Sequence, residues 1–281
     1  MVRRLHFAKL NPSGNTTVIV LDPLERELYA EVAKQLMGPE GLGADQVGFV
    51  GEAKDPKALG RLNMMGGEFC GNAARAYAAY LAFIRHPSLT WHDGQAEVPI
   101  EISGYDGVLL PRISAINHET ASAHVISPMP IPNQVHFVDF GSDKLGLVNF
   151  EGISHAVAWE VSPSEDAFNE IASMYSRPDD AAFGVMFFSE EDSKIVPLVL
   201  VRDTGSLVWE GSCASGAVAV ACAVASRDRR STELRLSQPA GVLHVKVTWN
   251  EDISGAAVGG QVDMIACGSV FVRLPAFCRR T

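Results

Sequence analysis

Short segments of alternating or continuous apolar residues follow one another along the chain, and such segments are typical of β-strands. In the first half this pattern predicts strands at residues 5–10, 16–21, 46–50, 59–65, 98–103 and 108–113. In the second half it predicts strands at residues 135–140, 146–150, 156–161, 183–188, 196–201, 243–249 and 270–274. A turn of Pro12, Ser13, Gly14 and Asn15 separates the first two strands, which predicts a hairpin.

Four segments instead have helical character. A helix is expected at residues 25–37, which end before Gly38 and Pro39, and another at residues 164–175. The remaining two, at residues 73–84 and 213–226, each follow a glycine-containing loop and consist almost entirely of small apolar residues. Helices of that composition are buried, so we expect each to be wrapped by its own sheet.

The two halves repeat one order of elements: strands, a glycine-containing loop with one cysteine, a small-residue helix and more strands. Cys70 and Cys213 mark the same point of this repeat and lie 143 positions apart, too far for a solenoid. The expected fold is α/β (α+β), with two similar domains that face each other across a cleft. Each domain is a curved, mainly antiparallel sheet or barrel around a central helix. Residues 1–132, joined by a last strand at 268–281, form one domain, and residues 133–267 form the other.

A loop that contains Pro128, Pro130 and Pro132 is the expected linker between these domains. The length of 281 residues and the hydrophobic content of 47% provide enough apolar material for two cores. They exclude a disordered chain or a small disulfide scaffold.

Charge and the first residues limit the partners and the compartment. The formal net charge is −10 without a basic stripe, so we expect no nucleic-acid partner. No apolar stretch reaches the roughly 18 residues that a membrane span needs. The apolar run after Arg3 and Arg4 is interrupted by His6 and Lys9, which argues against a signal peptide and for the cytoplasm. Five cysteines without CxxC spacing are expected to be free thiols there.

Cys70 and Cys213 both stand at the predicted start of a helix. Unpaired N–H groups and the helix dipole at such a position favour a thiolate, and the same N–H groups attract a carboxylate. Two such helix starts on one cleft would place an anion site between two thiols. One cysteine could then remove a proton from a carbon atom while the other delivers a proton to its opposite face. The two thiols would titrate as a coupled pair.

These motifs resemble those of the diaminopimelate epimerase superfamily of cofactor-independent amino-acid racemases and epimerases. That superfamily has a Cys-Gly-Asn motif in its first half and a Cys-Gly-Thr/Ser-Gly motif in its second. Here they read Cys70-Gly71-Asn72 and Cys213-Ala214-Ser215-Gly216, and the resemblance extends to Gly14-Asn15 and Ser154-His155-Ala156-Val157. It therefore covers most of the chain.

Within the superfamily, the chain most resembles the histidine racemases of staphylopine-type metallophore biosynthesis. The shared segments are Asn11-Pro12-Ser13-Gly14-Asn15, Glu68-Phe69-Cys70-Gly71-Asn72-Ala73 and the pattern from Trp209 to Gly216. Gly152-Ile153-Ser154-His155 replaces the Gly-Asn-Pro-His motif with which diaminopimelate epimerases read the far end of their substrate. Diaminopimelate is therefore not the expected substrate, and histidine is.

The resemblance implies the roles of the site residues. Cys70 and Cys213 would be the acid/base pair. Backbone N–H groups of Gly71, Asn72, Ala214 and Ser215 would bind the α-carboxylate. Asn15 would line the pocket, and Glu210 is our candidate for the α-ammonium group, although a carboxylate there could also cap the helix. A homodimer is compatible with the resemblance.

Neither a cofactor nor a metal is expected. The chain has no dinucleotide fingerprint, and His118, Glu119 and His124 have the wrong spacing for a zinc protease motif. Cys222 lies on the opposite side of its helix from Cys213 and is expected in the core. His155 is either a core histidine or a substrate contact. Two alternatives stay open: a racemase or epimerase of another amino acid, and a non-catalytic or redox binding protein whose two cysteines form a disulfide.

Overall fold

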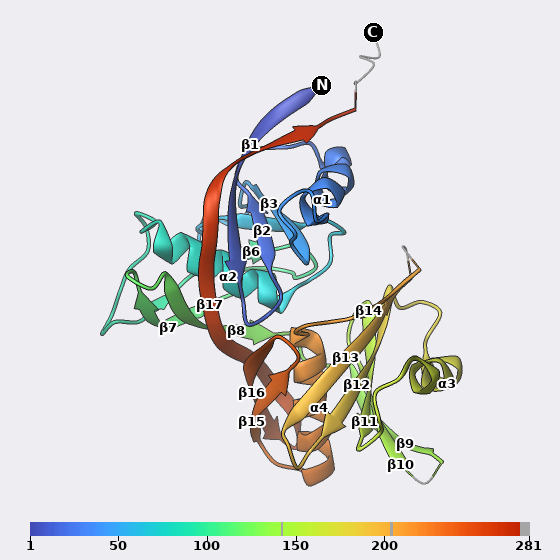
Figure 1. The fold of residues 1–281 in the computed structure, drawn as a ribbon. Coiled ribbons are helices and arrows are strands. Elements are labelled where there is room, and N and C mark those ends of the chain that lie inside the picture. The colour runs from blue at the N-terminus through green and yellow to red at the C-terminus, as the bar shows by residue number, and fades with distance from the viewer. Residues whose placement is uncertain (142, 203–204, 276–281) are drawn as a thin grey trace. The chain divides into compact units, whose positions relative to one another are not determined.

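The computed structural model describes residues 1–141, 143–202 and 205–275 (Figure 1). The chain divides into two compact units, which we call unit 1 (Met1–Ser127 and Gln261–Thr281) and unit 2 (Pro128–Gly260). This division lies a few residues before the expected boundaries at 132 and 267. The end of the expected last strand, with Cys278, lies outside the described residues.

Unit 1 contains an η1 turn and two α-helices among its strands. Its helical segments are η1 (Arg26–Leu28), α1 (Tyr29–Met37) and α2 (Gly71–Phe83). Its strands are β1 (Val2–Asn11), β2 (Thr17–Val20), β3 (Gln46–Gly51), β4 (Arg61–Met64), β5 (Ala96–Glu97), β6 (Glu101–Ile102), β7 (Arg112–Asn117), most of β8 (Ser122–Met129) and the second part of β17 (Asp252–Arg273). Most pairings are antiparallel, whereas β2 pairs with β3 and β4 with β6 in parallel.

Helix α2 is the central helix of unit 1 and crosses β1 and β2 (Figure 1). Its alanines are fully buried, together with Leu10, Ile19, Leu62 and Val125 from the surrounding strands. Alanine side chains are short, so strands can pack closely against this helix on several sides. The prediction of a buried central helix is confirmed for this unit.

Unit 2 has the same plan. Its helices are α3 (Glu165–Tyr175) and α4 (Ala214–Asp228). Its strands are β9 (Gln134–Phe140), β10 (Asp143–Asn149), β11 (Ile153–Trp159), β12 (Ala182–Ser189), β13 (Lys194–Val201), β14 (Ser206–Trp209), β15 (Thr232–Gln238), β16 (Gly241–Asn250) and the first part of β17. Parallel pairing occurs between β11 and β12 and at one position between β13 and β15; the other pairings are antiparallel.

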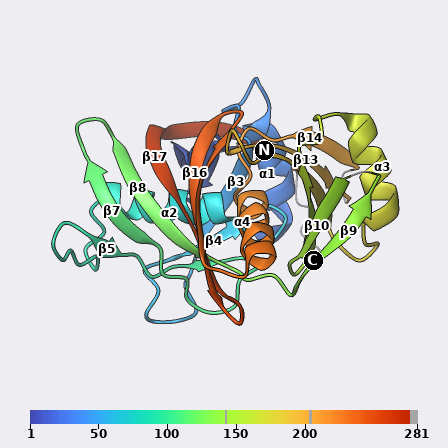
Figure 2. The ribbon, with the colours of Figure 1, turned by 90° about the horizontal axis from the view of Figure 1, so that it is seen from below.

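Two helices cover opposite faces of the sheet in unit 2 (Figure 2). Phe183 and Phe187 of β12 pack with Phe168 of α3 on one face. On the other face, a Cβ added to Gly146 would lie 3.1 Å from Cβ of Ala223 in α4. A strand covered on both faces is apolar throughout rather than alternating, which explains the continuous apolar run of β12. Helix α4 is therefore the central helix of unit 2, as predicted.

Several predicted elements differ from the structure. The strand expected at residues 98–103 is shorter in the structure and consists of β6 alone. Val98 and Ile100 form backbone hydrogen bonds with Pro111 and Leu109 outside any regular strand. The proline loop is partly strand, since β8 continues through Pro128 to Met129. Strands β8, β14 and β15 were not expected, and β17 is far longer than the segment predicted at 270–274. No helix in the described ranges is long and apolar enough to span a membrane.

Candidate active site

Cys70 is the N-cap of α2. Its backbone is extended (φ −135°, ψ 112°), and its Sγ accepts a hydrogen bond from the N–H of Ala73 at 3.4 Å. The N–H of Asn72 points at the same sulfur. A side chain that accepts from the first-turn amides is the usual way to begin a helix, here with sulfur as the acceptor. The predicted helix start is confirmed, with the cysteine one residue before the helix.

Gln46 was not predicted, and it faces the thiol of Cys70. Its Oε1 lies 3.1 Å from Cys70 Sγ and accepts the S–H hydrogen bond. Its Nε2 donates to Thr17 Oγ1 at 2.8 Å, and that hydroxyl donates to the carbonyl of Asn15 at 3.2 Å. Because Thr17 uses its one proton on Asn15, it can only accept from Gln46, and this fixes which end of the amide faces the sulfur. The chain of bonds therefore matches a protonated Cys70.

Cys213 repeats this geometry at α4 in unit 2. It is the N-cap, with φ −115° and ψ 111°, and its Sγ accepts from the N–H of Gly216 at 3.4 Å. Gln238 of β15 holds its backbone on both sides: Oε1 accepts from Cys213 N at 2.7 Å, and Nε2 donates to Cys213 O at 3.4 Å. A glutamine thus supports each cysteine, through the thiol in unit 1 and through the backbone in unit 2.

Two polar side chains lie against the sulfur of Cys213. Ser215 Oγ is 3.5 Å from Sγ and 3.0 Å from Nε2 of His155. The thiol also donates a hydrogen bond to the carboxylate of Glu210. Glu210 therefore contacts the thiol rather than capping α4, whose N-cap bond is made by the cysteine itself. His155 is fully buried, and this burial lowers its pKa to about 3, so it is neutral.

Burial opposes ionisation of both thiols. Burial raises the pKa of Cys70 to about 11, against the opposing hydrogen bonds from the helix start. Burial also raises the pKa of Cys213 well above its ordinary value, and the charge and hydrogen bond of Glu210 add to this. The first-turn N–H groups favour each thiolate as expected, but desolvation outweighs them, so the net shift of both pKa values is upward.

The remaining expected site residues are positioned unequally. Gly71 and Ala214 are buried at the helix starts, and Ser215 is half-buried. Asn72 is buried with its Oδ1 turned to Arg75 at 2.7 Å, so its side chain points into unit 1. Asn15 follows a turn in which Ser13 (φ 62°) and Gly14 (φ 92°) both have left-handed backbone. The Asn15 carbonyl accepts the hydrogen bond of Thr17 Oγ1, in the series of hydrogen bonds that leads through Gln46 to Cys70.

Each cysteine is thus surrounded by members of its own unit, and both predicted motifs form the start of a central helix. The described cysteines Cys70, Cys213, Cys222 and Cys267 are free thiols. Cys222 is fully buried, as predicted. Sequence reasoning missed Gln46, Gln238 and Arg75, because a buried glutamine or arginine carries no motif and gains its role only from partners distant in the chain.

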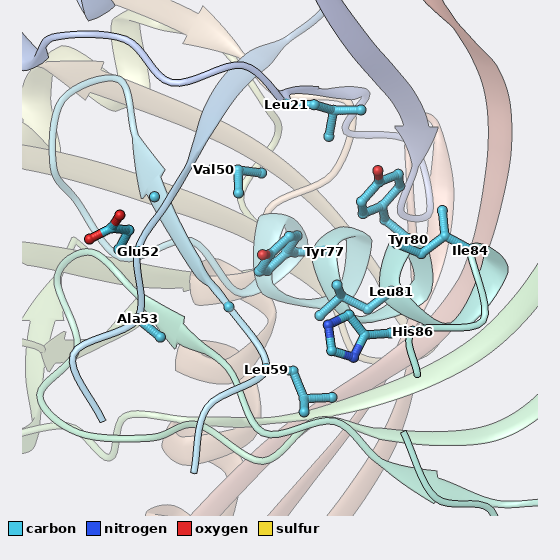
Figure 3. Close-up of a pocket in the computed structure, with 12 residues that line it drawn as sticks. Leu21, Val50, Glu52, Ala53, Leu59, Tyr77, Tyr80, Leu81, Ile84 and His86 are labelled. Carbon is cyan, nitrogen blue, oxygen red and sulfur yellow. The ribbon is translucent and has the colours of Figure 1, made fainter. Parts of the chain in front are cut away.

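A separate pocket of about 620 Å³ lies in unit 1 beside the second half of α2 (Figure 3). Tyr77, Tyr80 and His86 line it, with Glu52 at its edge. None of the predicted site residues lines this pocket, so we do not assign it to the candidate site. Within the described ranges, no cluster of three His, Cys, Asp or Glu side chains is arranged to hold a metal ion.

Solved structures with this fold include isomerases. A probable proline racemase from Agrobacterium radiobacter K84 matches with a TM-score of 0.66 and 11% identity, over 98% of this chain and 94% of its own. A methylitaconate-delta-isomerase matches with a TM-score of 0.64 and 12% identity, over all of both chains. At these identities the likeness shows the fold alone, a curled sheet around a central helix that isomerases of different substrates share.

Sequence relatives are more specific. The family model described as "Histidine racemase CntK N-terminal domain" matches residues 4–271. A histidine racemase of Fusobacterium nucleatum subsp. nucleatum is 31% identical over 96% of this chain and 98% of its own length. One of Staphylococcus aureus is 26% identical over 95% and 98%. The chain belongs to the histidine racemase family, and so to the amino-acid racemases among the isomerases.

Proposed function

We propose that this protein interconverts the two enantiomers of histidine by proton transfer between two cysteines, without a cofactor. The observation that carries the proposal is the pair of N-cap cysteines, Cys70 and Cys213, in equivalent places of two similarly built units. The names of the relatives support histidine as the substrate.

In the proposed reaction, the thiolate of one cysteine takes the α-proton. The electron pair of the broken C–H bond stays on carbon, delocalised into the carboxylate, and a new S–H bond forms. The thiol of the other cysteine then gives its proton to the opposite face of that carbon and becomes a thiolate. No redox change occurs, and the two sulfurs exchange roles in the reverse direction.

A raised thiol pKa has two opposite effects on this chemistry. The α-proton of an amino acid is weakly acidic, so a more basic thiolate removes it more readily, but the ideal pKa of a catalytic base lies near the operating pH. A pKa of about 11 at Cys70 makes its thiolate rare but strongly basic. The N–H groups of Gly71, Asn72, Ala214 and Ser215 would then bind the carboxylate on which charge accumulates.

Glu210 has two uses in this proposal. Its carboxylate is the partner proposed for the α-ammonium group of the substrate. It also accepts the hydrogen bond of the Cys213 thiol in the structure. When the ammonium group binds, the Glu210 carboxylate would interact with it and would interact less strongly with the thiol. That shift makes the Cys213 thiolate easier to form only when substrate is present.

The test is α-proton exchange in D₂O. Reduced protein without added cofactor is mixed with single L-amino acids, and the α-proton signal is followed by NMR and the enantiomers by chiral chromatography. Histidine should lose its α-proton signal and gain the D-enantiomer. Cys70→Ser and Cys213→Ser should each abolish racemisation, whereas Cys267→Ser, at an exposed cysteine on β17, should not.

Other outcomes distinguish the alternatives. Exchange of a different amino acid with the same dependence on both cysteines would replace histidine as substrate. No exchange with any amino acid, together with a disulfide between Cys70 and Cys213 in unreduced protein, would favour the redox or binding alternative. Activity that survives both cysteine substitutions would refute the two-thiol mechanism.

The resemblance also supports three finer proposals. The protein works in the cytoplasm, acts as a homodimer and supplies D-histidine for an opine-type metallophore. Light scattering after size exclusion tests the dimer, and a mass near 30.2 kDa would refute it. Loss of the metallophore after gene deletion, restored by D-histidine, tests the pathway.

A further inference from the structure

A buried arginine follows Cys70 by five residues on helix α2. Arg75 of α2 is fully buried and is the largest side chain with that property among the described residues. One guanidinium nitrogen, Nη2, donates to the Asn72 side chain at 2.7 Å and to the Pro12 carbonyl at 3.0 Å, and the other, Nη1, to Ser13 Oγ at 3.4 Å. Its Nε has no hydrogen-bond partner in the described part of the chain.

Among the described residues, no carboxylate pairs with Arg75. All three acceptors are neutral, and none of the ion pairs among the described residues includes Arg75. A buried charge is costly unless it is paired. The position adds to the cost, because a cation near the start of a helix opposes the helix dipole. Burial lowers the pKa of Arg75, which reflects the same penalty.

The anion that is electrostatically coupled to Arg75 is Cys70 in its ionised form. Asn72 links the two groups, because its side-chain Oδ1 accepts from Arg75 Nη2 at 2.7 Å and its backbone N–H points at Cys70 Sγ. A guanidinium charge held this near an ionisable thiol favours the charged form of the thiol, and the Cys70 charge correspondingly raises the pKa of Arg75. An uncompensated cation beside a thiol that must ionise is a reason for this residue to be buried there.

Arg75 also joins two parts of the half-site. Through Pro12 and Ser13 it holds the turn that leads to Asn15, and through Asn72 it holds the first turn of α2. Side chains on a helix lean toward its N-terminus, which is why a residue five positions after Cys70 reaches back to this place.

We propose that Arg75 is a positioning residue of the Cys70 half-site, whose guanidinium fixes Asn72 and the Pro12–Ser13 turn and whose buried charge stabilises the Cys70 thiolate. The inference rests on the proposed two-thiol function, in which Cys70 becomes a thiolate in every turnover. A brace without an electrostatic role is the competing explanation.

The test is the pH dependence of Cys70 alkylation by iodoacetamide, followed by mass spectrometry of the peptide that contains Cys70. Arg75→Met should raise the ionisation midpoint by at least about one pH unit, so that alkylation slows about ten-fold at a fixed lower pH. Arg75→Lys keeps the charge and should leave the midpoint within about half a unit. The matched control is Arg61→Met, which removes a cation that pairs with Glu101 instead, and it should not shift the midpoint.

An unchanged midpoint in folded Arg75→Met would overturn the electrostatic role and leave only the brace. If this variant does not fold, Arg75→Gln decides instead, because it removes the charge but keeps a donor for Asn72. Alkylation needs no substrate, so the result is independent of the racemase assay. Wild-type protein that racemises histidine without a midpoint shift in the variants refutes the inference alone. A midpoint shift in a protein that racemises nothing refutes the proposed function alone.

Discussion

The acidic side chain of Glu210 lies against the thiol of Cys213, the proposed acid/base group of unit 2. Glu210 raises the pKa of Cys213 through its charge and by accepting the thiol hydrogen bond. Removal of that charge should therefore make the thiolate easier to form. The same change should weaken racemisation, because the proposed partner of the substrate ammonium group is lost.

We predict that Glu210→Gln lowers the ionisation midpoint of Cys213, with alkylation about ten-fold faster at neutral pH. The same substitution should lower kcat/KM for histidine. Peptide-resolved alkylation measures the first effect and chiral chromatography the second. Glu251→Gln removes an exposed carboxylate of the same unit and is the control. Slower alkylation of Cys213 in Glu210→Gln would show that the carboxylate assists ionisation instead of opposing it.

At the scale of single residues, the sequence predicted the positions that belong to motifs. Cys70 and Cys213 lie at helix starts as expected, because each stands between a glycine-containing loop and a segment of small apolar residues with helical character. The sequence could not predict the net direction of their pKa values, since burial depends on the strands that surround each helix. Nor could it predict Gln46, which meets Cys70 from a strand 24 positions away.

At the scale of elements, close approach between α4 and β12 holds the Cys213 half-site. A Cβ on Gly216 would lie 2.1 Å from Sδ of Met186 and 3.2 Å from Sγ of Cys213. Only glycine fits between the helix start and the strand without displacing one of these sulfurs. The second glycine of the motif is therefore explained by packing as well as by any contact with substrate.

We predict that Gly216→Ala lowers the free energy of unfolding by about 1–3 kcal/mol, the usual cost of overpacking a core. Urea unfolding measures the change. Gly255→Ala in β17 of the same unit is the control, because its added Cβ would meet Thr248 at an ordinary 3.7 Å. Equal unfolding midpoints for the two variants would mean that Met186 moves aside without cost.

Elements with clear ends were predicted well, and elements without them were missed. Helix α3 begins at its Ser164 N-cap and ends at Tyr175, within one residue of the prediction. The long strand β17 passes through Ser254, Gly255, Gly259 and Gly260, residues with low strand propensity, and its pairing with β16, β1 and β8 holds it extended. Such strands are determined by their neighbours rather than by their own sequence.

The pH range over which the whole molecule is stable follows from buried groups in both units. On the acid side the relevant group is His155, whose pKa burial lowers to about 3. The folded state keeps this imidazole neutral, whereas the unfolded chain protonates it below its ordinary value. Its contribution to stability is therefore complete above the ordinary pKa and is lost as the pH falls toward 3.

We predict that unit 2 loses about 1.4 kcal/mol of stability per pH unit below about 6.5 because of His155. Three of the four tryptophans, Trp159, Trp209 and Trp249, lie in unit 2, so tryptophan fluorescence reports its unfolding. His155→Asn should flatten this dependence, while His244→Asn, at an exposed histidine of β16, should not. An unchanged acid slope in His155→Asn would assign the loss to other groups.

On the alkaline side the corresponding group of unit 1 is Cys70, whose pKa burial raises to about 11. The folded state keeps the thiol protonated, whereas the unfolded chain ionises it above its ordinary value. Stability is therefore complete below that value and falls as the pH rises toward 11, by about 1.4 kcal/mol per unit and about 3 kcal/mol in total.

We predict that Cys70→Ser removes this part of the alkaline slope in urea unfolding followed by far-UV circular dichroism. Cys267→Ser, at an exposed cysteine of the same unit, should keep the wild-type slope. If Cys70→Ser also keeps it, water solvates the half-buried thiol well enough to cancel its desolvation, and the strongly basic thiolate that the proposed mechanism uses would lose its physical cause.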